Sequence, residues 1–257
     1  MHPPLVHLVG AGPGDADLLT LRAARLLQIA DVIVHDRLVG AGVLELANPA
    51  ARRIDVGKAA GRHALPQAEI NQLLVDLARH GKRVVRLKCG DPLVFGRAGE
   101  EMAALRAADI SYEVVPGVTA AFAAAADFEL PLTLRGVSSS MVFTTGHDLK
   151  GGPLPDWAKL AIAGATVAVY MGRSIAADVA KRLIDAGLAP DTAVAVVENA
   201  SLGDRRMFHG TLADLPSLER RSDLTGPVMT IIGDAVAGAN FARSQALALH
   251  ERETLAA

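Results

Sequence analysis

The chain has 257 residues, with 26 Lys and Arg against 28 Asp and Glu, so its net charge of −2 gives no bulk electrostatic case for nucleic-acid binding. A single Cys excludes an internal disulfide and a metal site built from a Cys cluster. The mean hydropathy is +0.28, but the apolar stretch 114–126 contains Pro116 and Gly117 and is too short to span a bilayer. The N-terminus shows no export signal, so we expect a cytoplasmic protein without membrane partners.

Strand and helix patterns alternate through the first half of the chain. Pro66 and Gly81 mark the start and the end of one predicted helix. The elements predicted from hydrophobic periodicity are strand 5–9, helix 19–30, strand 32–35, helix 66–81, strand 84–87, helix 99–108 and strand 112–115. This order is typical of an α/β domain rich in βαβ units.

The second half predicts another α/β unit. Ser174 is the expected N-cap of a helix that ends before Gly187, and the tail after Gly238 is expected to form a peripheral helix. The predicted elements are helix 119–126, strands 141–144 and 166–170, helix 174–186, and strands 193–198 and 228–232. The predicted organisation is an N-terminal α/β domain at 1–132, a C-terminal α/β domain at 133–240 and a tail at 241–257.

Several predicted strands run directly into loops that contain glycine. Such a turn ends the sheet ladder, and in open α/β sheets the rim at the carboxyl ends of the strands is where ligands bind. These strand-to-loop segments are 8–15, 85–97, 114–119, 168–172 and 231–234. Their recurrence predicts a ligand with a polar body and two or more parts.

The loop Gly10-Ala11-Gly12-Pro13-Gly14-Asp15 raises the question of a dinucleotide site. The dinucleotide fingerprint needs a third Gly where this chain has Asp15, and Pro13 is inserted in the turn. An acid at a helix N-terminus also opposes phosphate binding. The residues favour a cofactor without phosphate, with a purely structural turn as the alternative.

Many short blocks of the chain form an ordered series. In the first half the blocks are Val9-Gly10-Ala11-Gly12-Pro13-Gly14-Asp15, Asp36-Arg37-Leu38-Val39, Val56-Gly57-Lys58, Arg86-Leu87-Lys88, Gly90-Asp91-Pro92, Phe95-Gly96-Arg97 with Glu100-Glu101, and Val115-Pro116-Gly117-Val118-Thr119. In the second half they are Pro131-Leu132-Thr133, Thr145-Gly146-His147, Tyr170-Met171-Gly172 and Val197-Glu198-Asn199. In this order the blocks resemble the uroporphyrinogen-III C-methyltransferases of the tetrapyrrole methylase family, from residue 5 to about residue 236.

The resemblance implies two α/β domains with S-adenosylmethionine and the active site in the cleft between them. It implies no metal, since catalysis rests on alignment and proton transfer. By position, Asp36 would accept a proton and Lys58 would donate one. The cofactor-binding residues implied by position are Pro13, Cys89, Gly90, Asp91, Val94, Thr119, Ala120, Met171 and Ala200.

The implied substrate is uroporphyrinogen III, which two methyl transfers convert to precorrin-2 in sirohaem or cobalamin biosynthesis. The resemblance also implies a homodimer. Guanidinium groups can hold the substrate carboxylates bidentately, and a polar loop His can contact them. The substrate-binding candidates are Arg37, Arg97, Arg135, Arg173 and His147. Two alternatives remain at this point: a related precorrin methylase that acts at another ring carbon, and a non-catalytic tetrapyrrole or cofactor carrier.

Four departures from the family pattern affect the site. Cys89 and Ala200 stand where Gly is usual, Leu134 replaces a His, and Asp127-Phe128 replaces a Tyr and a small residue. If position 89 needs a positive φ, the Cys is strained; in an extended backbone it fits and only narrows the pocket.

Overall fold

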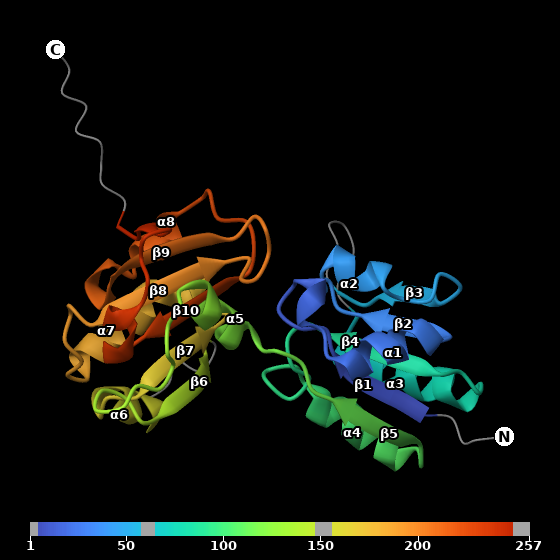
Figure 1. The fold of residues 1–257 in the computed structure, drawn as a ribbon. Coiled ribbons are helices and arrows are strands. Elements are labelled where there is room, and N and C mark those ends of the chain that lie inside the picture. Colours follow the sequence, from blue (N-terminus) through green and yellow to red (C-terminus); the bar gives the residue numbers. More distant parts are fainter. Residues whose placement is uncertain (1–4, 58–64, 147–155, 249–257) are drawn as a thin grey trace. The chain divides into compact units, whose positions relative to one another are not determined.

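The structure is a computed structural model, and it describes residues 5–57, 65–146 and 156–248. The chain divides into two compact units, Met1–Ala120 and Ala121–Ala257 (Figure 1). Each unit has its own sheet and its own buried core. The prediction of two α/β units therefore agrees with the structure.

The first unit is built on a sheet in which all paired strands are parallel. The strand order is β3-β2-β4-β1-β5. Its strands are β1 (Leu5–Gly10), β2 (Val32–His35), β3 (Arg52–Asp55), β4 (Val84–Lys88) and β5 (Ser111–Val115). The carboxyl ends of all five strands consequently lie at one edge of this sheet.

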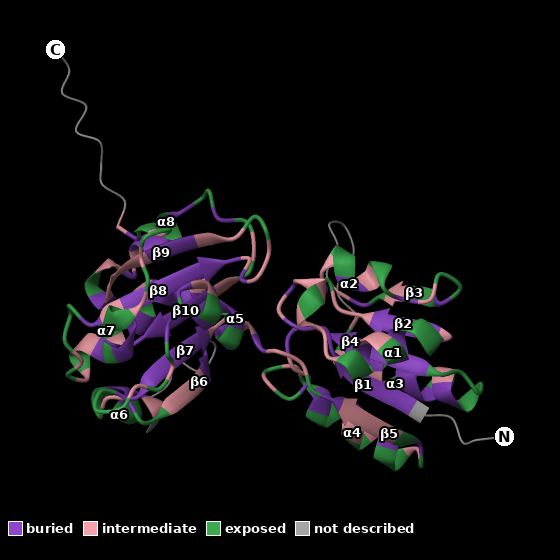
Figure 2. Cartoon of the chain, viewed as in Figure 1, coloured by how far each residue is buried: buried purple, intermediate pink, exposed green. Residues whose placement is uncertain are grey.

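Helices cover both faces of the first sheet. On one face α1 and α2 pack against Val9, Ile33 and Leu87, and on the other α3 and α4 pack against Leu8 and Val34. The helices are α1 (Leu21–Ile29), α2 (Ala41–Glu45), α3 (Gln67–Arg79) and α4 (Ala98–Ala107). Because strand residues alternate between the two faces, both sets are buried, which is typical of a parallel sheet (Figure 2).

The second unit has a mixed sheet with the order β11-β9-β8-β10-β7-β6. The pairs β6–β7 and β9–β11 are parallel, and β7–β10, β10–β8 and β8–β9 are antiparallel. Its strands are β6 (Met141–Thr145), β7 (Thr166–Tyr170), β8 (Ala193–Glu198), β9 (Arg206–Thr211), β10 (Val228–Ile232) and β11 (Gln245–Ala246). Its helices are α5 (Ala120–Asp127), α6 (Asp156–Ile162), α7 (Ala176–Asp185) and α8 (Ser217–Arg220).

The division between the units falls before the body of α5, whereas the sequence places it between 132 and 133. The packing of α5 within the second unit accounts for the difference. Phe122 makes an edge contact with Phe143 at 5.8 Å between ring centroids, and Asp127 Oδ1 pairs with Arg205 Nε at 2.9 Å. Phe128 is fully buried in this unit.

Two local predictions are wrong. Ser174 is not an N-cap, because it lies inside a short 3-10 turn, η3 (Arg173–Ile175), and α7 begins after it at Ala176. The tail after Gly238 does not form a helix in its described part. It continues to the short strand β11, where Gln245 pairs with Phe208 of β9.

Candidate active site

Three glycines meet at the carboxyl ends of β1, β4 and β5 in the first unit. A Cβ atom on Gly10 would lie 2.6 Å from Gly117 Cα and 2.7 Å from the Gly90 carbonyl oxygen, closer than real Cβ atoms come. Gly12 and Gly90 pair through their backbones, with N–O distances of 3.2 and 2.7 Å. Only glycine allows this approach, so this rim of the sheet is built from closely packed main chain, and Gly10, Gly12 and Gly90 are buried in it.

The rim lies where the chain reverses its direction of winding. The segment after β1 leads to α1 on one face of the sheet, and the segment after β4 leads to α4 on the other face. Because β1 and β4 are neighbours, their two loops diverge at the strand ends, which is where ligands bind in open α/β sheets. The predicted residues Pro13, Cys89, Gly90 and Asp91 belong to these two loops.

Asp91 holds the rim together. Its Oδ2 accepts a hydrogen bond from the Gly117 amide at 3.0 Å, and its Oδ1 accepts one from the Leu93 amide at 2.8 Å. The Val94 amide donates to the Asp91 carbonyl at 3.2 Å. The carboxylate therefore fixes the shape of the loop that carries Val94 and ties it to the loop before Thr119, which is buried.

Cys89 does not strain the loop, because its backbone is outside the left-handed region; the positive φ, +66°, belongs to Gly90. The Cys89 side chain is half-buried. Burial, and then the negative charge of Asp36, raise the pKa of the thiol to about 11. The thiol is thus protonated and a weak nucleophile at neutral pH.

Asp36 directly follows β2, the strand next to β4. Its amide donates to the Leu87 carbonyl at 3.2 Å, and its Oδ1 accepts a hydrogen bond from Arg86 Nη2 at 2.6 Å. The Asp36 side chain is 33% exposed, whereas that of Arg86 is 2% exposed. Asp36 therefore presents a carboxylate at the rim that is held from below by a buried cation.

The other predicted groups near Asp36 are described only in part. Arg37 is exposed, and Gly57 lies so close to it that a Cβ on Gly57 would be 2.5 Å from Arg37 Cβ. Lys58 comes directly after Gly57, but Lys58 and the predicted substrate ligand His147 lie outside the described residues.

Arg97 and Arg135 are both exposed. Arg97 Nε and Nη2 donate to the two oxygens of Glu100 at 2.7 and 2.9 Å, and this bond raises the pKa of Arg97. Arg135 lies in a tight turn closed by the bridge between Leu134 and Ser138. Both guanidinium groups can reach solvent-borne anions.

Strained backbone gathers at one edge of the second sheet. Met171 follows β7 with φ +53°, and Asn199 and Ser201 follow β8 with φ +54° and +72°. Non-glycine residues in this region are uncommon and gather at functional sites. Ala200, which lies between the last two, is buried and is not left-handed, so it replaces a usual Gly without strain.

The buried carboxylate of Glu198 fixes the neighbouring turn. Its Oε1 accepts hydrogen bonds from the Thr225 and Gly226 amides, both at 2.6 Å, and its Oε2 accepts one from Arg206 Nε at 2.7 Å. Burial acts to raise the pKa of Glu198, but these bonds outweigh it and hold the pKa below its usual value. Gly226 thereby lies against Asn199, where a Cβ would be 2.0 Å from Oδ1.

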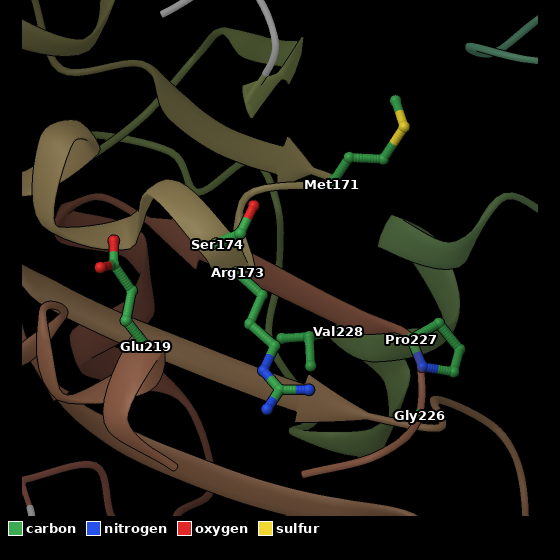
Figure 3. Close-up of a pocket in the computed structure, with 7 residues that line it drawn as sticks. All are labelled: Met171, Arg173, Ser174, Glu219, Gly226, Pro227 and Val228. Carbon is green, nitrogen blue, oxygen red and sulfur yellow. The ribbon is translucent and has the colours of Figure 1, made fainter. Parts of the chain in front are cut away.

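A cavity of about 590 Å³ opens beside this edge of the second unit. It is lined by Met171, Arg173, Ser174, Glu219, Gly226, Pro227 and Val228 (Figure 3). The Arg173 side chain extends towards Val228, and its Nη2 donates to the Arg221 carbonyl at 2.8 Å. Of the predicted residues, Met171 and Arg173 therefore share one cavity.

One observation bears on what the loop after β1 can bind. The loop does not open directly into a helix: Asp15 caps a 3-10 turn, η1 (Ala16–Leu18), and α1 begins later with Thr20 as its cap. The helix N-terminus that a pyrophosphate would need is therefore displaced.

No cluster of three or more His, Cys, Asp or Glu suited to a metal ion occurs among the described residues. In the same part of the chain, no helix is both long and apolar enough to cross a membrane.

The family model described as Tetrapyrrole (Corrin/Porphyrin) Methylases matches residues 5–216. The chain belongs to this family. A tetrapyrrole methylase from Methanosarcina barkeri, named S-adenosyl-L-methionine-dependent uroporphyrinogen III methyltransferase, is 47% identical over 90% of this chain and 91% of its own length. The siroheme synthase of Chromobacterium violaceum is 51% identical over 90% of this chain but only 49% of its own length, so the chain spans about half of that protein.

Solved structures of tetrapyrrole methylases show the same fold. Uroporphyrin-III C-methyltransferase from Thermus thermophilus, in complex with S-adenyl homocysteine, superimposes with a TM-score of 0.77 at 41% identity, covering 91% of this chain and 99% of that one. A cobalt precorrin-4 methyltransferase superimposes with a TM-score of 0.79 at 33% identity, covering 90% and 95%. The resemblance drawn from the sequence blocks is confirmed.

Sequence reasoning did not find the partners of the predicted residues. It treated Arg86, Lys88 and Glu101 only as parts of motif blocks, although the structure joins them to Asp36. The available signal was Arg86 and Lys88, two charged residues in a strand that is otherwise apolar, because such groups are buried only when they are paired.

Proposed function

We propose that this tetrapyrrole methylase transfers two methyl groups from S-adenosylmethionine to uroporphyrinogen III and so forms precorrin-2. The observation that carries the proposal is the 47% identity to the Methanosarcina barkeri enzyme over nearly the full length of both chains. It is supported by the Thermus thermophilus structure that holds S-adenyl homocysteine. In the same proposal the protein is a cytoplasmic homodimer, and its product precorrin-2 is used in the synthesis of sirohaem or cobalamin.

The carboxyl ends of β1, β4 and β5 in the first unit are the proposed binding edge for S-adenosylmethionine. Gly10, Gly90 and Gly117 let these strand ends pack backbone against backbone, which fixes the shape of the main chain that the cofactor would contact. Asp15 does not disfavour a sulfonium as it would a phosphate. The proposed cofactor-binding residues are Pro13, Cys89, Gly90, Asp91, Val94, Thr119 and Ala120 in the first unit and Met171 and Ala200 in the second.

The bound cofactor would supply an electrophilic methyl group, and the substrate ring must lose a proton once it is methylated. Asp36 is proposed to accept that proton, because its carboxylate is partly exposed at the rim and is held by Arg86. Lys58 is proposed to donate a proton. Arg37, Arg97, Arg135, Arg173 and His147 are proposed to hold substrate carboxylates.

A related reaction on another ring carbon is the second candidate. The cobalt precorrin-4 methyltransferase superimposes as well as the uroporphyrin-III enzyme does, with TM-scores of 0.79 and 0.77. Sequence identity separates them, at 33% against 41%. The fold alone thus leaves the ring position open, and identity favours uroporphyrinogen III.

The test is transfer of isotopically labelled methyl groups. The purified protein is incubated with methyl-labelled S-adenosylmethionine and uroporphyrinogen III, and S-adenosylhomocysteine binding is measured by calorimetry. We expect label in the tetrapyrrole. Calorimetric binding without label transfer would instead support a non-catalytic carrier, and label transfer only to a partly methylated corrinoid would support the second candidate.

A further inference from the structure

Two buried cations on β4 face one buried carboxylate on α4. Arg86 and Lys88 are each 2% exposed, and Glu101 is fully buried. Because strand residues two apart point to the same face, both cations approach α4 from the sheet. The proposed function uses none of these three groups directly.

The hydrogen bonds that Glu101 accepts from the described residues all converge on one oxygen. Its Oε1 accepts from Arg86 Nε at 2.9 Å, from Lys88 Nζ at 3.0 Å and from Gln67 Nε2 at 3.4 Å. Its Oε2 is buried and accepts no hydrogen bond from the described residues. The carboxylate is therefore oriented by the two cations of β4.

This arrangement is a poor way to gain stability. Desolvating three charges costs free energy that their attraction only partly returns, and the buried Oε2, which accepts no hydrogen bond within the described part of the chain, adds to the cost. Burial and the neighbouring charge of Arg86 lower the pKa of Lys88 despite the pull of Glu101. Apolar residues of similar volume would fill the same space at a lower cost.

Arg86 links the buried ion pairs of Glu101 to Asp36 at the carboxyl end of the sheet. The guanidinium uses Nε for Glu101 and Nη2 for Asp36, and its Nη1 donates to the Val34 and Leu87 carbonyls, both at 3.4 Å. Burial acts to lower the pKa of Arg86, but the carboxylates of Asp36 and Glu101 outweigh it and keep the pKa above its usual value. Because Glu101 holds Nε of the planar Arg86 guanidinium, the Nη2 group is fixed as a hydrogen-bond donor to Asp36.

We propose that Glu101, oriented by Lys88 and acting through Arg86, is a positioning residue that holds the Asp36 carboxylate in place for proton transfer. The inference rests on the proposed function, in which Asp36 accepts the proton. Glu101 need not touch substrate or cofactor. Glu101 sets the orientation of the Arg86 guanidinium group, and this group in turn sets the position of the Asp36 carboxylate.

The test compares Glu101→Gln, Asp36→Asn and the double variant with the wild type. Glu113→Gln is the matched control, because Glu113 is also ion-paired in the first sheet but bonds to His7 Nδ1 within β1, away from the rim. Turnover, KM for the cofactor and calorimetric affinity for S-adenosylhomocysteine are measured for each protein. Crystal structures of the wild type and of Glu101→Gln report the position of Asp36.

We expect Glu101→Gln to lower kcat by about tenfold to hundredfold, since a misplacement near 1 Å costs about that much. The affinity for S-adenosylhomocysteine should stay within about twofold of the wild-type value, because the substitution removes no contact that the bound ligand makes. In the Asp36→Asn background the same substitution should lower kcat by less than about twofold, since residues that act as a unit are not additive. Glu113→Gln should leave kcat unchanged.

Undiminished kcat in Glu101→Gln, or losses that multiply in the double variant, would overturn the inference. If Glu101→Gln does not fold, Arg86→Lys replaces it, because an ammonium keeps the charge but cannot serve both carboxylates as a fork does; full kcat in Arg86→Lys also overturns the inference. If the wild type transfers no methyl group, the proposed function fails separately. The crystal structures then decide the positioning: an Asp36 carboxylate displaced in Glu101→Gln supports it, and an unmoved one refutes it.

Discussion

Replacing Gly10 with Ala tests the claim that three strand ends close on one another through glycine. The new Cβ would lie 2.6 Å from the Cα and N of Gly117 and 2.7 Å from the Gly90 carbonyl oxygen. Ordinary contact begins near 3.4 Å, so β1 and the segment after β5 must separate by about 0.8 Å. All of these neighbours are backbone atoms, and no side chain can rotate away.

Overpacking of this kind costs about 1–3 kcal/mol of unfolding free energy. Because the displaced atoms form the rim, turnover should fall by up to about 10²-fold as well. Gly99→Ala is the control: Gly99 is exposed in α4, a Cβ added there would meet nothing within 4 Å, and Ala should add about 0.5–1 kcal/mol of stability. Urea unfolding followed by circular dichroism measures both variants. A Gly10→Ala protein as stable and as active as the wild type would refute the close approach.

Three further predictions follow from single groups. Asp36→Asn should lower turnover by about 10²–10⁴-fold with little change in cofactor affinity, and unchanged kcat in the folded variant would make Asp36 a structural residue. The pKa of Cys89 is raised to about 11, so its alkylation should be slow near neutral pH and its rate should rise about tenfold per pH unit up to about pH 10. Bound S-adenosylhomocysteine should suppress the alkylation. A rate that levels off near pH 9, or one that the ligand does not change, would contradict the placement of Cys89 at the cofactor site. The pKa of Asp31 is lowered to about 2 by its hydrogen bonds to Arg83, so its stabilising effect should be present above about pH 4 and lost as the pH falls through about 2. Since the Asp31–Arg83 pair is at the surface, Asp31→Asn should lower the free energy of unfolding by less than about 1 kcal/mol at neutral pH. A larger loss in urea unfolding would contradict a solvent-exposed pair.

Most of the buried strands could be predicted from the sequence because they are short runs rich in apolar residues. The predicted strand 84–87 differs from β4 by one residue, and 193–198 matches β8. Strand β3 escaped prediction because it is an edge strand whose sequence, Arg52 to Asp55, has three charged and exposed residues. Strand β9 has only two large apolar residues, Met207 and Phe208, and so gives no longer apolar run.

The candidate site could be predicted only as a set of loops. Glycine after an apolar run indicates a strand end, which is a local property of the sequence. The order of strands in a sheet is not local. Asp36 meets Arg86 only because β2 lies beside β4, although 50 residues separate them in the chain. The pairing of Glu101 with both Arg86 and Lys88 depends in addition on how α4 packs on the sheet.

The identity of the product is the most direct test of methyl transfer to uroporphyrinogen III. Uroporphyrinogen III is incubated with the protein and excess S-adenosylmethionine, and the tetrapyrrole product is examined by mass spectrometry and NMR. We expect a product that carries two additional methyl groups and has the spectrum of precorrin-2. A tetrapyrrole that gains no methyl group, or one methylated at a different ring carbon, would contradict it.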